Sequence, residues 1–239
     1  MKNRSFIFTA VVASLLYVSC TKPQTTLSEN ERPFNPPIMG WSSWNAFLVD
    51  ISEDIIKHQA DLMVEKGLKD AGYQYINVDD GYFGKRDENG VMQANEKRFP
   101  NGMKPVADHI HSLGMKAGLY TDAGTRTCGS LWNKDSIGIG AGIYGHEPQD
   151  AQLYFGDWGF DFIKIDYCGG EVLGLDEKER YTSIRNSIDK VNKNVSINIC
   201  RWAYPGTWAK DAATSWRISG DINAHWNSLK YVVGKNLYL

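Results

Sequence analysis

Short apolar segments alternate with amphipathic helical segments from residue 36 onward, and this alternation restricts the fold more than any other feature of the sequence. Six of the apolar segments have the length and composition of strands. They span residues 37–41, 73–78, 116–121, 160–165, 195–200 and 215–219. The helices expected after them cover residues 52–71, 103–113, 150–158, 176–191 and 222–239. Single helical crossovers between successive strands predict a parallel sheet that is covered by helices.

Polar and aromatic side chains follow nearly every predicted strand at its C-terminal end. They are Trp44, Asp79, Asp80, Tyr120, Asp122, Asp166, Arg201 and Asp221. An open doubly wound sheet would concentrate such residues after one or two strands, whereas all strands of a TIM barrel contribute to its site. The distribution therefore predicts an α/β fold of the TIM (β/α)8-barrel type. Because such a barrel has eight units and only about six precede Leu239, we expect the barrel in this chain to be incomplete.

The first twenty residues have the pattern of an export signal. Lys2 and Arg4 precede an apolar run over residues 6–18, which is too short for an ordinary transmembrane helix. Cys20 follows a small residue just after this run, as in bacterial lipoprotein signals, so we expect Cys20 to be lipidated; a plain secretory signal is the alternative. The expected domains are a signal peptide at 1–20, a polar linker at 21–35 and the barrel at 36–239. The expected location is the periplasm or the cell surface of a bacterium.

Charge and cysteine content limit the classes of ligand. The net charge is −2 and no basic stripe occurs, so the sequence lacks the electrostatic surface that nucleic-acid binding requires. Three cysteines remain besides Cys20, and in an exported protein they leave one pair and one thiol. They are Cys128, Cys168 and Cys200, and their spacing does not select the pair. A C-x-x-C arrangement is absent from the sequence, so no structural zinc site is expected.

Two aspartates stand at the ends of predicted strands, Asp166 after the fourth and Asp221 after the sixth. Acidic side chains are disfavoured inside strands and costly to bury unpaired, although capping of a helix is an alternative role. Lys164 lies on the same face of its strand as Asp166, because strand side chains repeat every two residues. We expect this cation to keep Asp166 ionised, as a nucleophile requires.

A second acidic pair, Asp79 and Asp80, follows the second predicted strand. Two carboxylates can bind a divalent cation, so a metal-dependent barrel enzyme is one alternative. Aromatic side chains at the strand ends favour a sugar pocket instead, in which carboxylates accept hydrogen bonds from hydroxyls beside flat rings. These aromatic residues are Trp41, Trp44, Tyr82, Tyr120 and Trp202.

Six short motifs occur in order between residues 36 and 239. They are MGWSSWN at 39–45, VDDGY at 78–82, GLYTD at 118–122, GHE at 145–147, KIDYC at 164–168 and WRISGDI at 216–222. Together they resemble the family-27 glycoside hydrolases, the α-galactosidase or melibiase family, which also contains α-N-acetylgalactosaminidases. The resemblance implies a TIM barrel followed by a small antiparallel β-domain. On this basis we expect the chain to lack the last barrel strands and the β-domain.

The resemblance also implies roles for individual residues. Asp166 resembles the nucleophile and Asp221 the general acid/base of a retaining, double-displacement mechanism that needs no metal or organic cofactor. Trp44, Asp79, Asp80, Tyr120, Lys164 and Arg217 resemble substrate-binding residues, and Cys128 and Cys168 resemble the disulfide of the family. Retaining geometry implies carboxyl groups about 5–5.5 Å apart. The pKa values of the pair should differ, with Asp166 ionised and Asp221 protonated at the start.

Arg201 departs from the family pattern, which usually has an acidic residue after the fifth-strand cysteine to recognise the substituent at C2. We expect Arg201 to lie next to the sugar and to contact it. The predicted function is exo-acting hydrolysis of terminal α-galactosides in oligo- or polysaccharides. α-N-Acetylgalactosaminides, β-L-arabinopyranosides and isomalto-type glucans are alternative substrates, and a non-catalytic sugar-binding surface lipoprotein is the alternative to an enzyme. The expected partners are a carbohydrate and, only through the lipid anchor, a membrane.

Overall fold

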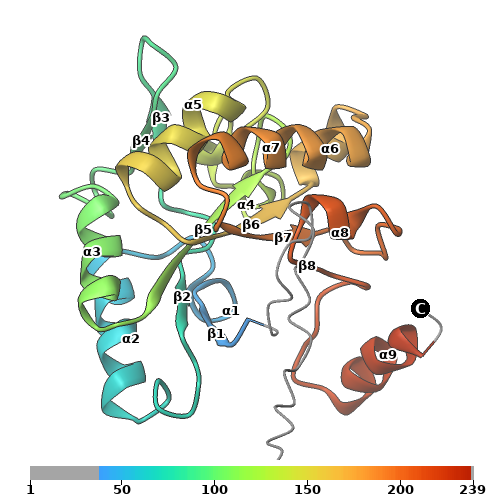
Figure 1. Cartoon of the computed structure of the whole chain (residues 1–239), viewed down its shortest axis with the longest axis horizontal. Helices are drawn as coiled ribbons and strands as arrows, with labels where there is room; N and C mark the ends of the chain where they lie inside the picture. Colours follow the sequence, from blue (N-terminus) through green and yellow to red (C-terminus); the bar gives the residue numbers. More distant parts are fainter. Residues whose placement is uncertain (1–37, 238–239) are drawn as a thin grey trace, which may run out of the picture. The chain divides into compact units, whose positions relative to one another are not determined.

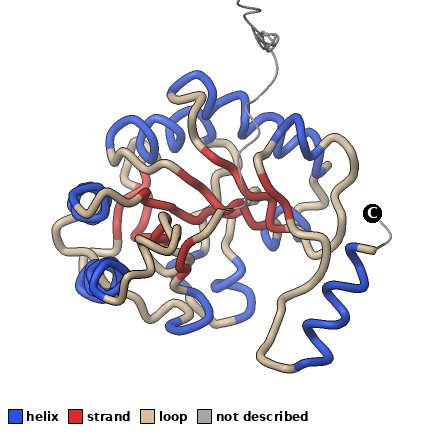
Figure 2. The backbone as a smooth tube through the Cα atoms, turned by 60° about the horizontal axis from the view of Figure 1, so that its bottom comes forward, coloured by secondary structure: helices blue, strands red, loops and turns tan. Residues whose placement is uncertain are grey.

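The computed structural model describes residues 38–237, in which six strands form one parallel sheet with the order β1-β2-β5-β6-β7-β8. The strands are β1 (Gly40–Ser42), β2 (Tyr75–Asn77), β5 (Lys116–Asp122), β6 (Phe162–Asp166), β7 (Ser196–Cys200) and β8 (Ser215–Trp216). Their spatial order follows the chain, and each neighbouring pair is parallel. The sheet curves through the middle of the molecule with helices along its outer side (Figures 1 and 2). The predicted barrel architecture is therefore confirmed, as a half-barrel.

The longer helices follow the strands much as predicted. They are α2 (Glu53–Glu65), α3 (Lys104–Ser112), α5 (Glu147–Ala151) with the π-helical segment Gln152–Asp157, α7 (Glu177–Val191) and α9 (Trp226–Asn236). Short helical turns lie between them: α1 (Trp44–Phe47), α4 (Cys128–Trp132), the 3-10 turn Ser136–Gly138, α6 (Cys168–Val172) and α8 (Ala209–Ala212). The hydroxyl of Ser52 caps α2 by accepting a hydrogen bond from the Ile55 amide at 3.2 Å. The same helix ends at residue 65 and not at 71, because Gly67 adopts the left-handed conformation that stops a helix (φ 72°).

An antiparallel hairpin formed by β3 (Phe83–Arg86) and β4 (Met92–Ala94) was not expected. Arg86 joins this hairpin to α5 through a bidentate ion pair with Asp150, at 2.6 and 2.7 Å. The same guanidinium donates to the carbonyl oxygens of Gly90 and Gly142. The hairpin is therefore fastened to the helical layer and not only to the sheet.

The core lies between the sheet and the helices that cover it. Ile163 and Ile165 of β6 belong to this apolar core together with Ile184 and Ile188 of α7. Lys164 and Asp166 alternate with the two isoleucines and therefore lie on the opposite face of β6. One strand thus supplies apolar side chains to the core and ionisable side chains to the interior of the half-barrel.

Helix α9 differs from the other long helices, because none of its described side chains is buried. It stands apart from the sheet in both views (Figures 1 and 2). Within residues 38–237, none of the helices combines the length and apolarity that crossing a membrane requires. The predicted signal peptide with Cys20 and the predicted linker lie outside the described residues.

Candidate active site

The ionisable side chains meet at the C-terminal ends of adjacent strands because the strand register aligns them. Tyr120 is level with Lys164, and Asp122 is level with Asp166. Asp166 is in turn level with Cys200 on β7. Side chains in register on neighbouring parallel strands point to the same side of the sheet. These residues therefore face the interior of the half-barrel in two successive levels, Tyr120 with Lys164 and then Asp122 with Asp166 and Cys200.

A pocket of about 510 Å³ opens at this end of the sheet, a volume within the range of small-molecule sites. It is lined by Trp44, Asp79, Tyr120, Cys128, Trp132, Asn133, Lys164, Asp166, Cys168, Trp202, Arg217, Gly220 and Asp221. Most of the residues predicted for the site are therefore brought together in one pocket. They lie at or beyond the C-terminal ends of all six strands of the sheet.

Asp79 and Lys164 form an ion pair in the pocket. The ammonium nitrogen of Lys164 lies 3.0 and 3.3 Å from the two carboxylate oxygens of Asp79, and 5.1 Å from the centre of the Tyr120 ring. The hydroxyl of Ser42 donates to the same carboxylate at 3.1 Å. Burial acts to lower the pKa of Lys164, but the Asp79 carboxylate raises this pKa overall, so Lys164 stays a cation.

Asp80, which is also expected to bind the sugar, is buried and is not among the residues that line the pocket. Its carboxylate accepts hydrogen bonds from the amides of Gly81 and Gly129, both at 2.8 Å, and so joins the end of β2 to α4. Burial raises the pKa of Asp80 to about 7, although the Thr127 hydroxyl acts against this rise. Every carboxylate oxygen of Asp79 and Asp80 accepts a bond from a protein donor, which disfavours the alternative of a divalent-metal site.

Asp166 lies at the end of β6 and is 5% exposed. Its carboxylate accepts a hydrogen bond from the Tyr167 amide at 3.1 Å. Burial raises the pKa of Asp166 above its usual value, and the cation of Lys164 offsets only part of the rise. The charge of Lys164 thus acts in the expected direction by lowering the pKa of Asp166, but burial has the larger effect and the charge of Asp79 adds to the rise.

Asp221 borders the same pocket from a contrasting environment, with 81% of its side chain exposed. Its carboxylate accepts a hydrogen bond from Arg217 at 2.6 Å. The guanidinium of Arg217 also donates to the buried sulfur of Cys200 at 3.4 Å, so it connects the rim to the end of β7. One candidate carboxyl group is therefore buried and the other is open to solvent.

The disulfide implied by the resemblance, Cys128–Cys168, is present in the structure, and Cys200 is a free, buried thiol. The bond joins the first residues of α4 and α6, and both cysteines line the pocket. Next to the disulfide, the carboxylate of Asp122 accepts hydrogen bonds from the amides of Gly124 (2.7 Å) and Gly169 (3.0 Å). The wall of the pocket beside Asp166 is thus held both covalently and by a buried carboxyl group.

Arg201, which is expected to contact the sugar, is not among the residues that line the pocket. Its guanidinium is paired with Glu177 of α7 at 2.6 Å and approaches Glu171 of α6 at 3.5 Å. The same group lies 5.3 Å from the centre of the Tyr167 ring and 5.2 Å from that of Trp202. Arg201 therefore reaches the pocket only through Trp202, which does line it.

Sequence reasoning missed two lining side chains, Trp132 and Asn133, which belong to the segment between the expected strand at 116–121 and the expected helix at 150–158. A large aromatic residue in this segment was the available signal. Conversely, Trp41 packs edge-on against Phe47 with ring centres 6.2 Å apart, and Tyr82 is buried in the core. These two aromatics, expected near a sugar, serve packing instead.

The amino-acid sequence of the chain is similar to those of known proteins. The family model described as Alpha galactosidase A matches residues 36–237. An α-galactosidase A from Cellvibrio japonicus is 39% identical over 229 residues, which are 95% of this chain and 53% of that protein. An α-galactosidase from Cyamopsis tetragonoloba is 42% identical over 206 residues, covering 85% of this chain and 47% of that protein.

The fold has counterparts among solved structures as well. An α-galactosidase from Saccharomyces cerevisiae, solved with raffinose, has a TM-score of 0.70 and 36% identity, with 79% of this chain and 41% of that chain covered. The chain spans about half the length of the curated relatives that it matches.

Proposed function

Because this chain belongs to the α-galactosidase A family, we propose that it supplies the catalytic pocket of a retaining glycosidase that removes terminal α-galactosyl groups from oligo- or polysaccharides. The observation that carries the proposal is the lining of one pocket by two candidate catalytic carboxyl groups, Asp166 and Asp221, together with the Asp79–Lys164 ion pair.

The proposed reaction has two steps. Asp166 attacks the anomeric carbon while Asp221 protonates the leaving oxygen, which gives a glycosyl-enzyme. Asp221 then removes a proton from water, and the water displaces Asp166 from the sugar. A retaining enzyme of this kind holds its two carboxyl groups about 5–5.5 Å apart when substrate is bound. Asp166 must be ionised to attack, and the Lys164 cation favours that form against the opposing effect of burial.

Recognition of the sugar is assigned to the groups that share the pocket. The Asp79 carboxylate accepts hydrogen bonds from hydroxyls, and Lys164 and Arg217 donate them. Trp44 and Tyr120 supply flat apolar surfaces beside the ring. Asp80 is proposed as a further sugar-binding residue, and its carboxylate also holds α4 through the Gly129 amide. All of this chemistry uses side chains alone, so no cofactor enters the proposal.

The galactoside is proposed as the substrate because the relatives at about 40% identity are named α-galactosidases and one related structure was solved with raffinose. The α-N-acetylgalactosaminide, β-L-arabinopyranoside and isomalto-type substrates differ from it at single ring positions or in linkage. A panel of nitrophenyl glycosides separates these specificities directly.

Export is part of the same proposal. The Cys128–Cys168 bond supports it, since disulfides persist in oxidising compartments. The proposed lipid at Cys20 adds a membrane anchor, which mass spectrometry of the N-terminal peptide from the native host would detect.

The experiment that tests the function uses the full chain with 4-nitrophenyl α-D-galactoside. We expect wild type to release nitrophenol and Asp166→Gly to lose this activity. Added azide should then replace the missing carboxylate and form β-galactosyl azide, which identifies Asp166 as the nucleophile.

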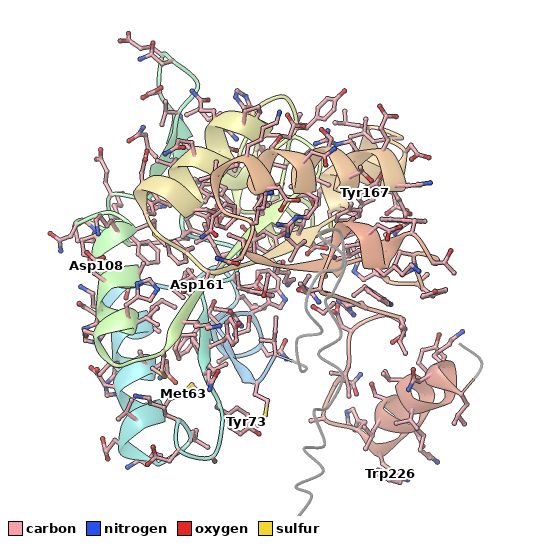
Figure 3. The ribbon with its side chains drawn as sticks, in the orientation of Figure 1. Met63, Tyr73, Asp108, Asp161, Tyr167 and Trp226 are labelled. Carbon is pink, nitrogen blue, oxygen red and sulfur yellow. A yellow bond between two sulfur atoms is a disulfide. The ribbon has the colours of Figure 1, made fainter. Side chains whose placement is uncertain are left out.

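The matched control is Asp108→Asn, an exposed aspartate on α3 away from the pocket (Figure 3), which should retain full activity. If wild type releases nothing from the α-galactoside, the proposed substrate is wrong. If Asp166→Gly stays active without azide, the assignment of the nucleophile is wrong.

A further inference from the structure

Trp132 is the most exposed large aromatic residue of the pocket lining, with 76% of its surface accessible. It shares the pocket with Asp166, which is buried, and with Asp221, which is exposed. The lining therefore changes from buried side chains at the strand ends to an exposed rim. Trp132 and Asp221 are the exposed side chains of that rim within the described residues.

The backbone that carries Trp132 is held in place although the indole ring itself is not buried. It is the last residue of α4, whose first residue, Cys128, is joined to α6 by the disulfide. The Gly129 amide donates to the buried Asp80, and the Thr127 hydroxyl accepts a hydrogen bond from the Ser130 amide at 3.2 Å.

The chain that follows Trp132 is held as well. The carboxylate of Asp135 lies 3.4 Å from Arg98, and its backbone amide donates to the Gly129 carbonyl at 3.1 Å. The indole ring is thus presented at the mouth of the pocket by a short helix that is tied at both ends. A rigid aromatic ring of this kind binds flat apolar surfaces at a low cost in side-chain entropy.

We propose that Trp132 and its neighbour Asn133 form the binding site for the leaving group of the substrate. This inference rests on the proposed function. Asp221 protonates the leaving oxygen in that function, so the departing sugar must lie at the exposed rim that Asp221 and Trp132 share. The apolar face of a pyranose ring stacks on the indole of Trp132. The side-chain amide of Asn133, which also lines the pocket, forms hydrogen bonds with the hydroxyls of that ring.

The inference predicts an effect that depends on the leaving group. Trp132→Ala should lower kcat/KM about five- to tenfold for a disaccharide of galactose α-linked to glucose, because the stacked ring loses its partner. Hydrolysis of α-galactosyl fluoride should stay unchanged, since fluoride has no ring to stack. Trp132→Phe, which keeps a flat ring, should restore most of the disaccharide activity.

The matched control is Trp226→Ala. Trp226 is similarly exposed, at 68%, but lies on α9 away from this pocket (Figure 3), so both substrates should be hydrolysed at wild-type rates. Wild-type activity of Trp132→Ala on both substrates would overturn the inference. An equal loss for both substrates would overturn it too, because it would indicate damage to the catalytic pocket.

A binding measurement separates this inference from the proposed function. Titration calorimetry measures binding without turnover. On Asp166→Asn, which lacks the proposed nucleophile, it compares the affinity for the disaccharide with the affinity for galactose. Adding Trp132→Ala should weaken disaccharide binding and leave galactose binding unchanged. If this holds while wild type hydrolyses nothing, Trp132 still binds the second sugar ring and the glycosidase proposal alone fails. If both affinities are unaffected, or the disaccharide does not bind, the leaving-group site is wrong.

Discussion

Arg201 illustrates how a charged residue next to a pocket can act without touching what the pocket binds. Glu177 and Glu171 neutralise its charge outside the pocket, while the guanidinium plane supports Trp202. Its influence on a substrate is therefore exerted through the position of an aromatic ring. This arrangement makes Arg201 a positioning residue.

Arg201→Ala should consequently raise KM about three- to tenfold for an aryl α-galactoside and change kcat little, because a guanidinium–aromatic contact stabilises by about 0.5–1 kcal/mol or more. Arg201→Lys keeps the ion pair with Glu177 but lacks the planar group, so its KM should lie between those of wild type and Arg201→Ala. Steady-state kinetics on both variants give the test. Lys210→Ala, at an exposed position of α8, is the control. A loss confined to kcat would contradict the positioning role.

The buried carboxyl group of Asp122 should make the free energy of unfolding depend on pH. Burial raises its pKa from 3.8 to about 7, so between those values the folded chain holds a proton that the unfolded chain has released. The free energy of unfolding contributed by Asp122 therefore falls as pH rises from about 4 to about 7.

Asp122→Asn should remove that contribution and flatten the curve of Tm against pH over this range. The variant amide oxygen can still accept the hydrogen bonds from Gly124 and Gly169, which share one carboxylate oxygen. Thermal unfolding at half-unit pH steps, with Asp108→Asn as the exposed control, measures the difference. Parallel Tm curves for wild type and Asp122→Asn would show that Asp122 does not titrate in this window.

At the residue scale, sequence was informative where the determining contact is local. The shared face of Lys164 and Asp166 follows from strand periodicity, and Ser52 caps the helix that it precedes. The environment of Arg201 could not be predicted, because its partner Glu177 lies 24 residues earlier in another element. The environment of Asp80 could not be predicted either, because its carboxylate accepts a hydrogen bond from the distant Gly129 amide.

At the scale of elements, a buried ion pair joins the hairpin β3–β4 to α5. Arg86 and Asp150 are almost fully shielded from solvent, and both terminal guanidinium nitrogens of Arg86 bond the carboxylate. Removing one partner of such a pair leaves a buried charge without compensation. The hairpin should therefore be sensitive to either residue.

Arg86→Ala should lower the free energy of unfolding by about 3–5 kcal/mol. Lys104→Ala, which breaks an exposed ion pair with Asp108, should change it very little. Urea unfolding followed by circular dichroism compares the two variants. Equal effects would mean that the Arg86–Asp150 pair is solvated in solution.

The order of strands and long helices could be predicted because hydrophobic periodicity is a property of each segment alone. The hairpin could not, since Arg86 and Asp150 are 64 residues apart and the strands are short. Helices α4 and α6 were also missed. They are only five residues each, too short for a periodic pattern, and the disulfide between them helps to hold them in place.

At the scale of the whole molecule, α9 is the part least supported by packing. The described helix buries no side chain, whereas α7 buries Tyr181, Ile184 and Ile188 against the core. A helix of this length is marginally stable in water without tertiary contacts. Its stability should therefore be separable from that of the half-barrel.

Amides of α9 should exchange with deuterium at least about 100-fold faster than those of α7, because local opening of α9 breaks no core contact. Hydrogen-exchange mass spectrometry on the full chain measures both helices in one sample, so α7 serves as the internal reference. Similar protection of the two helices would show that α9 is packed against another surface in solution.

The alignment of Asp122, Asp166 and Cys200 at one height of the sheet has an evolutionary consequence. The buried isoleucines that maintain the strands and the side chains that perform chemistry belong to different faces, and the rim residues belong to segments beyond the strands. Single substitutions at rim positions such as Trp132 and Asn133 can therefore accumulate without altering the pairing of the strands. A change in the preferred substrate can then arise at the rim while the strands that carry Asp166 and Lys164 are kept.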